Sequence, residues 1–245
     1  MNAPALRARS VGEILDLAFQ LYRSRWKQMA TATGVLVLPL LVLEAVVPLE
    51  MLGMMETVAG LFFLAASAAV VVIASEAYMG REVAAADAVR TVGRRFLSVW
   101  GAAMFQGILV FLGLLLFIIP GIIAMALTFV MQQAVMIEGK TTNEAYQRSR
   151  SLAEGEFTHI LLTGVLAFFI VMFAMMGFGA VIGLGVADVR LATLLTNVAL
   201  IAINPLTAVV GTVLYYDLRI RKEAFDVSVA TDRLAELPVE PVPAY

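Results

Sequence analysis

The 245-residue sequence has no cysteine and a single histidine, His159. Without cysteine the chain has no disulfides, no thiolate nucleophile and no thiolate ligand for a metal ion. One histidine with no neighbouring pair of carboxylates does not make a metal site. We therefore expect no metal or cofactor, and we interpret His159 as a residue at the membrane surface.

Charged residues are also scarce. They make up 15% of the chain, hydrophobic residues make up 61%, and the mean hydropathy is +0.91. Soluble domains are roughly 25% charged and 45–50% apolar. The composition predicts an all-α integral membrane protein, and no nucleic-acid partner is expected.

Six apolar stretches predict six transmembrane helices, since each span needs about 20 predominantly apolar residues. They are residues 29–48, 57–77, 101–119, 121–137, 160–186 and 191–216. The third and fourth form one run broken only by Pro120-Gly121, a strong turn signal. The sequence favours two short spans joined there; the alternative is one kinked helix with a re-entrant end.

The basic residues are distributed unevenly between the two sides of this topology. Residues 1–28, 78–100, 138–159 and 217–245 contain 16 of the 17 Lys and Arg residues, and the exception, Arg190, lies beside Asp188. Basic residues concentrate in cytoplasmic segments. We expect a protein of the cytoplasmic (inner) membrane with both termini in the cytoplasm.

The cytoplasmic segments contain three amphipathic stretches, residues 10–27, 83–97 and 141–153. Ser10-x-x-Glu13 and Thr141-x-x-Glu144 are typical of the capping boxes that begin helices. The pattern predicts three transmembrane hairpins, each preceded by a cytoplasmic interfacial helix. Residues 1–222 would form a single transmembrane domain. Residues 223–245, with five acids and one base, are predicted to be disordered.

No span contains a recognisable catalytic motif, so no catalytic residue is predicted and we expect a non-enzymatic protein. The candidate intramembrane polar residues are Glu44, Glu76, Asn197 and Asn204. The two acids lie near opposite membrane surfaces and are interpreted either as interfacial carboxylates or as parts of a proton or cation relay. Asn204-Pro205 indicates a helix kink.

The fifth span contains Gly179-x-x-x-Gly183. Small residues at this spacing let helices approach closely. The pair indicates internal packing or, alternatively, contact with another membrane protein.

The last span ends in Tyr215-Tyr216-Asp217, followed by three bases. Tyrosines suit headgroup depth, and bases suit anionic lipid; the alternative is an ordinary aromatic and basic flank. Asp217 is expected to pair with Arg221 one turn later or with a base of an interfacial helix. The candidate headgroup or partner contacts are Arg94, Arg95, Arg148, Arg150, Tyr215, Tyr216, Asp217, Arg219 and Arg221.

Three stretches carry a family resemblance: residues 9–23, the Pro120-Gly121 region through Ser149, and Pro205 through Glu223. Across residues 9–227 the chain resembles the membrane domain fused to some glycerophosphodiester phosphodiesterases, and its stand-alone relatives. In the fused enzymes a separate soluble barrel performs catalysis with His, Glu and a divalent metal. This chain has no matching residues, so the resemblance implies the membrane domain without that activity.

Three functions fit these features. The first is organisation of membrane lipids or partner proteins at the cytoplasmic face, favoured by the basic amphipathic segments. The second is a small transporter, channel or lipid-moving protein, indicated by the repeated units and the intramembrane acids. The third is an accessory subunit that packs against a larger membrane complex through the fifth span.

Overall fold

The computed structural model describes residues 4–235, which are helical with no β-strand in that range. The elements in chain order are α1 (Val11–Val46), η1 (Leu49–Met51), α2 (Leu52–Tyr78), α3 (Ala85–Leu116), α4 (Ile118–Thr128), α5 (Met131–Glu138), α6 (Thr142–Ala153), α7 (Phe157–Gly185), α8 (Val189–Glu223) and α9 (Phe225–Ala235).

Within residues 4–235, six helical stretches are long and apolar enough to cross a membrane. They are α1, α2, α3, α4 together with α5, α7 and α8, and each includes most of one of the six predicted apolar stretches. The prediction of an all-α, multi-pass membrane protein is confirmed at this level.

Two of the predicted amphipathic segments are not separate helices. α1 is continuous through residues 11–29, and α3 is continuous through residues 85–101, so each joins an amphipathic segment to an apolar one. In α1 the junction is Lys27-Gln28-Met29, three residues that favour helix. By contrast, α6 is separate because Gly139 and Gly155 flank it with φ values of 72° and 79°. Both predicted capping boxes, at Ser10 and Thr141, are present.

The chain reverses between α3 and α4 at Phe117, not at Pro120-Gly121 as predicted. Phe117 has extended backbone angles (φ −168°, ψ 162°), and Pro120 is the third residue of α4. Proline is tolerated there because the first N–H groups of a helix have no partner within it. A Cβ on Gly113 would lie 2.8 Å from the Gly121 Cα, so the two glycines allow close packing of α3 and α4.

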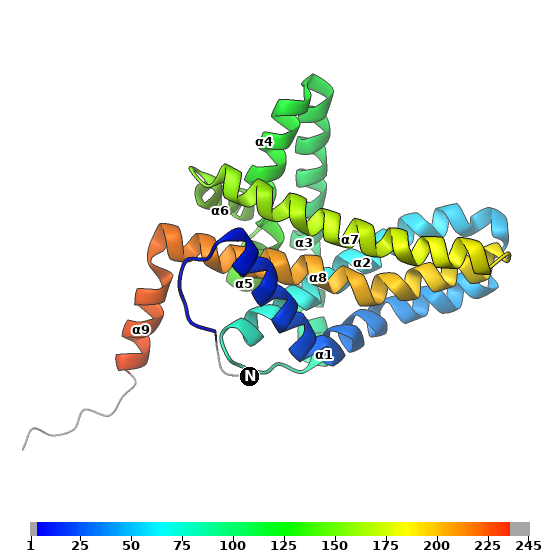
Figure 1. The fold of residues 1–245 in the computed structure, drawn as a ribbon, viewed down its shortest axis with the longest axis horizontal. Helices are drawn as coiled ribbons and strands as arrows, with labels where there is room; N and C mark the ends of the chain where they lie inside the picture. Colours follow the sequence, from blue (N-terminus) through cyan, green and yellow to red (C-terminus); the bar gives the residue numbers. More distant parts are fainter. Residues whose placement is uncertain (1–3, 236–245) are drawn as a thin grey trace, which may run out of the picture.

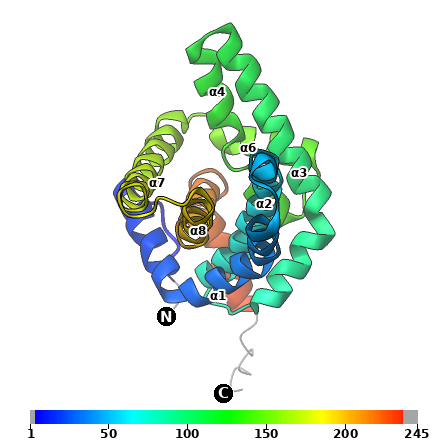
Figure 2. The same ribbon diagram turned by 90° about the vertical axis from the view of Figure 1, so that its right-hand side faces the viewer.

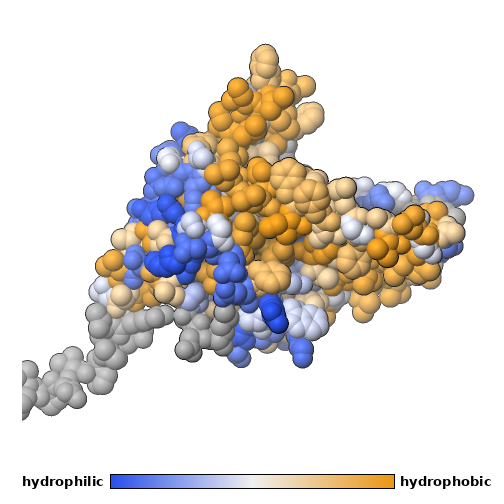
Figure 3. All heavy atoms as spheres, viewed as in Figure 1, coloured by the Kyte–Doolittle hydropathy of each residue, from blue (hydrophilic) through white to orange (hydrophobic). Residues whose placement is uncertain are grey.

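α1, α2, α7 and α8 lie alongside one another, whereas the α3–α4 pair diverges from them (Figures 1 and 2). α5 and α6 lie where the pair leaves the bundle. The tip of the pair is strongly apolar, since Leu115, Phe117 and Ile118 are 70–78% exposed. In Figure 3 hydrophobic residues cover much of the visible face, and hydrophilic residues gather at the end that carries α6 and the start of α7. We call this the polar end.

The centre of the bundle is α8 (Figure 2). It packs on α1, α2 and α7, and every residue from 208 to 218 is buried. Gly211 lets the Gln133 side chain of α5 lie directly against the α8 backbone. The second half of α8 is therefore surrounded by protein.

At the opposite end, Arg190 and Asp188 connect α8 to α1. Asp188 Oδ1 accepts from the Leu191 N–H at 2.7 Å and caps α8. Arg190 donates to the carbonyls of Ala45 and Val47, the latter at 2.9 Å, at the C-terminus of α1. Cations favour this end of a helix because its last carbonyls are unpaired.

The predicted disordered tail begins instead with α9. Phe225 packs 5.6 Å from the Tyr216 ring, and the Arg219 guanidinium lies 3.9 Å from the Phe225 ring centre. These contacts anchor the start of α9 to α8, an effect that charge composition alone does not reveal. Residues 236–245 of the predicted tail lie outside the described residues.

Candidate functional site

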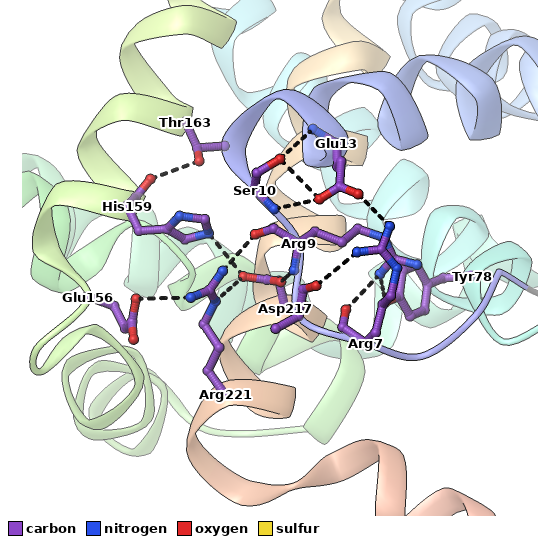
Figure 4. A network of polar contacts seen from close by, with 11 residues as sticks. Arg7, Arg9, Ser10, Glu13, Tyr78, Glu156, His159, Thr163, Asp217 and Arg221 are labelled. Carbon is purple, nitrogen blue, oxygen red and sulfur yellow. Dashed lines mark hydrogen bonds and ion pairs between the residues drawn. The ribbon is translucent and has the colours of Figure 1, made fainter.

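Asp217 is fully buried at the polar end and accepts hydrogen bonds from three parts of the chain (Figure 4). Its Oδ1 accepts from the Arg9 backbone N–H at 2.6 Å. Its Oδ2 lies 2.9 Å from His159 Nε2 and 2.7 Å from Arg221 Nε. The expected pairing with Arg221 is present. A buried carboxylate is tolerated when its charge is paired and its oxygens are hydrogen-bonded.

Arg9 is the second charged residue buried here, with 5% exposure. Its Nη1 donates to Tyr78 Oη at 2.8 Å and to the Arg7 carbonyl at 3.3 Å, and its Nη2 donates to the Ala5 carbonyl. The Arg9 carbonyl in turn accepts from Arg221 Nη2 at 2.6 Å. The segment before α1 is thus fastened to both α2 and α8.

Two stacked tyrosines extend this arrangement. The Tyr78 and Tyr216 ring centres are 4.5 Å apart, with ring planes 2° from parallel. Tyr216 Oη lies 2.8 Å from Ser75 Oγ, so the hydroxyl of this buried tyrosine has a partner. The pair joins the polar ends of α2 and α8 through apolar contact and hydrogen bonding together. We call Arg9, Tyr78, His159, Tyr216, Asp217 and Arg221 the Asp217 cluster.

A second cluster is centred on Glu138 at the end of α5. Arg148 Nε and Nη2 lie 3.0 and 2.7 Å from Glu138 Oε1, and Tyr215 Oη donates to the same oxygen. Arg219 Nε is 3.7 Å away. Arg148 also donates to Glu223, at 2.9 Å for its Nη2. We call these five residues the Glu138 cluster.

The charges of the Glu138 cluster stabilise one another. The hydrogen bond to Glu223 raises the pKa of Arg148 most; burial lowers it, and the hydrogen bond to Glu138 raises it further, so that the net change is upward. Arg148 therefore stays charged and bridges the ends of α5 and α8. The two clusters together join the N-terminal segment to α2, α5, α6, α7 and α8.

The two tyrosines and the aspartate predicted to contact headgroups are enclosed by protein. Tyr215 and Asp217 are 0% exposed and Tyr216 is 3% exposed. In this conformation they contact other helices, and none of the three reaches lipid.

The predicted arginine contacts fall into two groups. Arg148, Arg219 and Arg221 are held in ion pairs within the two clusters, and Arg95 donates to the Val135 and Met136 carbonyls at the end of α5. The other two arginines are exposed at the surface. Arg150 Nε lies 3.6 Å from Glu154 Oε1, and Arg94 has no acidic partner among the described residues.

Two further bases are exposed on α1 near the polar end. Arg23 and Lys27 have no acidic partner among residues 4–235, and they flank Trp26, which is 50% exposed. Phe19, one turn before Arg23, is 55% exposed. We call Phe19, Arg23, Trp26 and Lys27 the α1 patch. Arg23 and Lys27 belong to the predicted amphipathic stretch 10–27, but they were not among the predicted site residues.

The predicted intramembrane acids have different environments. Glu76 Oε2 lies 2.6 Å from Arg81 Nε at the exposed end of α2. Glu44 is 1% exposed at the opposite end of the bundle, where its Oε2 accepts from Asn197 Nδ2 at 2.7 Å. The structure thus brings together two predicted residues, Glu44 and Asn197, and keeps the two acids apart.

Around the predicted kink, α8 is continuous through Pro205. Proline removes one helical hydrogen bond, and Tyr22 Oη of α1 donates to the nearby Ala202 carbonyl at 2.7 Å. No side-chain hydrogen bond of Asn204 is found within residues 4–235. A side chain from another helix thus binds the backbone near the kink.

Gly179 and Gly183 lie on an open face of α7. A Cβ on either would meet nothing within 4 Å among the described residues, so the pair is not used for close packing within this chain. A contact with another membrane protein through this face remains a prediction.

Arg9, Tyr78 and Glu138 were not among the predicted site residues. Arg9 and Glu138 appeared only in the motifs that carry the family resemblance, and Tyr78 only as the residue after a predicted span. One signal was available: a carboxylate such as Asp217 accepts more hydrogen bonds than the one partner expected for it, either Arg221 or a base of an interfacial helix. Nothing local in the sequence identifies which donors these are.

No group of three or more His, Asp or Glu side chains that could hold a metal ion occurs within residues 4–235. Comparison of the chain with protein-family models, with curated proteins and with solved structures gives no match. The resemblance to the phosphodiesterase membrane domain therefore remains a prediction.

Proposed function

We propose that this protein is a non-enzymatic, multi-pass protein of the cytoplasmic membrane that binds anionic lipid headgroups at its cytoplasmic face. The α1 patch and Arg94 would make the contact. The proposal places the polar end, and both termini, in the cytoplasm. In this proposal the spans form the three predicted hairpins, and the first halves of α1 and α3 and the whole of α6 lie at the membrane surface.

The main support for this proposal is that some basic residues near the polar end are paired inside the two clusters, whereas others are exposed and unpaired within residues 4–235. Arg9, Arg148, Arg219 and Arg221 are engaged with acids, carbonyls or a tyrosine inside the two clusters. Arg23 and Lys27 are exposed and have no acidic partner within residues 4–235. Uncompensated positive charge therefore lies outside the two clusters, at Arg23 and Lys27 of α1, at Arg94 of α3 and at Lys222 near the end of α8.

The exposed tryptophans support the placement of these basic residues at the depth of the lipid headgroups. The chain has two tryptophans, and both are exposed: Trp26 at 50% and Trp100 at 41%. Trp26 lies between Arg23 and Lys27, whereas Leu97, one turn after Arg94, is 81% exposed. Tryptophan prefers the interface between headgroups and hydrocarbon, and neighbouring bases attract anionic lipid.

The test measures how much phosphatidylglycerol the protein retains from mixed phosphatidylglycerol–phosphatidylcholine nanodiscs. Each base near an anionic surface contributes about 1 kcal/mol, so Arg23→Ala and Lys27→Ala should each reduce relative affinity roughly fivefold. Arg94→Ala should act in the same direction, and high salt should abolish the difference.

Arg90→Ala is the matched control. Arg90 is also an exposed arginine of α3, but its Nη1 lies 2.9 Å from Asp87 Oδ1. Its removal should leave phosphatidylglycerol retention close to that of the parent protein. Equal retention by Arg23→Ala, Lys27→Ala and the parent would contradict the proposal.

A further inference from the structure

A cavity of about 520 Å³ lies between the first turns of α2 and α8. These turns are at the end of the bundle opposite the polar end (Figure 1). Polar side chains from both helices line the cavity, namely Glu56, Thr193, Thr196 and Asn197. By contrast, the hollow between α4 and α7 is lined by apolar residues, which acyl chains can cover. The cavity between α2 and α8 fits a ligand that has a polar group.

The threonines of α8 present acceptors to this cavity. The Thr193 hydroxyl donates to the Val189 carbonyl at 3.0 Å, and the Thr196 hydroxyl donates to the Ala192 carbonyl at 2.9 Å. A hydroxyl has one proton and two lone pairs. Because each proton is already used within α8, each threonine retains only lone pairs for a ligand.

Asn197 also offers an acceptor. Its Nδ2 donates to Glu44 Oε2 at 2.7 Å, and this bond fixes the orientation of the amide. The Asn197 Oδ1 has no hydrogen-bond partner among the described residues, and it is not among their fully enclosed polar atoms. The carbonyl oxygen of the amide is therefore free to accept from a ligand.

The only acid in the described lining, Glu56, has no positive charge beside it. Glu56 is exposed and has no basic partner within residues 4–235. Arg190, the base nearest to the cavity along α8, donates instead to the Ala45 and Val47 carbonyls of α1. The positive end of the α8 dipole is capped by Asp188. An acid among neutral acceptors favours a cation.

The α2 side of the cavity suits an organic cation. Gly60 and Phe63 follow Glu56 by four and seven residues, so the three lie on one face of the helix. The face of an aromatic ring attracts ammonium groups. A Cβ on Gly60 would meet nothing within 4 Å among the described residues, so this position leaves the cavity open.

From this geometry we infer that the cavity binds an organic primary ammonium ion. Glu56 is the counter-ion, and the oxygens of Thr193, Thr196 and Asn197 accept hydrogen bonds. A primary ammonium has three N–H donors, whereas a quaternary ammonium has none. The amine can belong to the ethanolamine headgroup of a phospholipid or to a water-soluble compound. This site is independent of lipid binding by the α1 patch, because the two lie at opposite ends of the bundle.

The phospholipid source is tested with the full chain in nanodiscs of mixed phosphatidylethanolamine and phosphatidylcholine. The parent protein should retain phosphatidylethanolamine in preference. Glu56→Gln should reduce this preference roughly tenfold, because it removes a charged hydrogen-bond acceptor. Glu50→Gln is the matched control: Glu50 is an exposed acid of η1 at the same end and does not line the cavity. Equal loss of the preference in both variants would overturn the inference.

The water-soluble source is tested in nanodiscs of phosphatidylcholine alone. Saturation-transfer NMR should detect phenethylamine bound to the parent protein, and the signal should be lost in Glu56→Gln. The N-trimethylated form of phenethylamine, which has no N–H, should give no signal; an equal signal from it would overturn the inference. Preference for the primary amine in one test and not the other identifies the source, and absence of that preference from both would overturn the inference.

Gly60→Leu provides a second variant if Glu56→Gln fails to fold. The new side chain should occupy the cavity without a clash at its Cβ, and it leaves Glu56 in place. Binding of the primary amine should fall in either test. Unchanged binding in Gly60→Leu would place the amine outside this cavity and overturn the inference.

Discussion

The two ends of the bundle bury acidic side chains in opposite ways. At the polar end, Asp217 is enclosed together with a backbone N–H, His159 and Arg221. At the other end, Glu44 is enclosed with one amide and no charge. The first arrangement gives both carboxylate oxygens a donor, whereas the second leaves Glu44 Oε1 without a hydrogen-bond partner among the described residues. Two equally buried carboxylates in one bundle can therefore differ in how their charge is compensated, because they have different hydrogen-bond donors.

The largest effect is expected from Asp217→Asn. After the substitution the remaining acidic partner of Arg221 is Glu156, whose Oε2 is 3.8 Å from Arg221 Nη1. The uncharged amide also takes the place of a carboxylate that faces three donors. Breaking a buried ion pair by removing one member costs about 3–5 kcal/mol. Thermal unfolding in mild detergent should report this loss. Asp87→Asn, an exposed acid of α3, is the control and should change stability by less than about 0.5 kcal/mol.

A smaller loss is expected from Glu138→Gln. Glu138 is half-buried, and Arg148 keeps its second partner, Glu223. Loss of hydrogen bonds to a charged group should reduce the free energy of unfolding by about 2 kcal/mol. Glu154→Gln on α6, whose pair with Arg150 is exposed, is the comparison variant. Equal stability of the two variants would mean that the Glu138 cluster contributes little.

The smallest effect is expected from Glu44→Gln. Glutamine keeps the shape of the side chain and an oxygen that accepts from Asn197, and Glu44 has no ion pair to lose within residues 4–235. The change in unfolding free energy should stay within about 0.5 kcal/mol, in contrast to Asp217→Asn. A loss as large as that of Asp217→Asn would mean that the two ends of the bundle depend equally on their buried acid.

Local patterns predicted the local structure well. The apolar stretches located the six candidate spans, the capping boxes located the starts of α1 and α6, and Asp217 was paired with Arg221 four residues later. Each of these rests on residues within a few positions of one another. The turn between α3 and α4 was misplaced by three residues, because proline is compatible with the first turn of a helix as well as with a loop.

The long-range partners could not be predicted in the same way. Arg9 is 208 residues from Asp217, and Tyr215 is 77 residues from Glu138. Tyr215 and Tyr216 were predicted to be interfacial residues, although α5, α6 and the N-terminal segment cover that part of α8. Which helix covers which face depends on packing that no local pattern encodes.

The fastening of the N-terminal segment to α8 has a consequence for biosynthesis. Arg9 emerges from the ribosome before the six candidate spans, and Asp217 only after five of them. Until α8 has been inserted, the segment before α1 lacks the acid that it binds in the finished protein. The Asp217 cluster therefore forms only after α8 has been inserted, and its formation requires all six candidate spans.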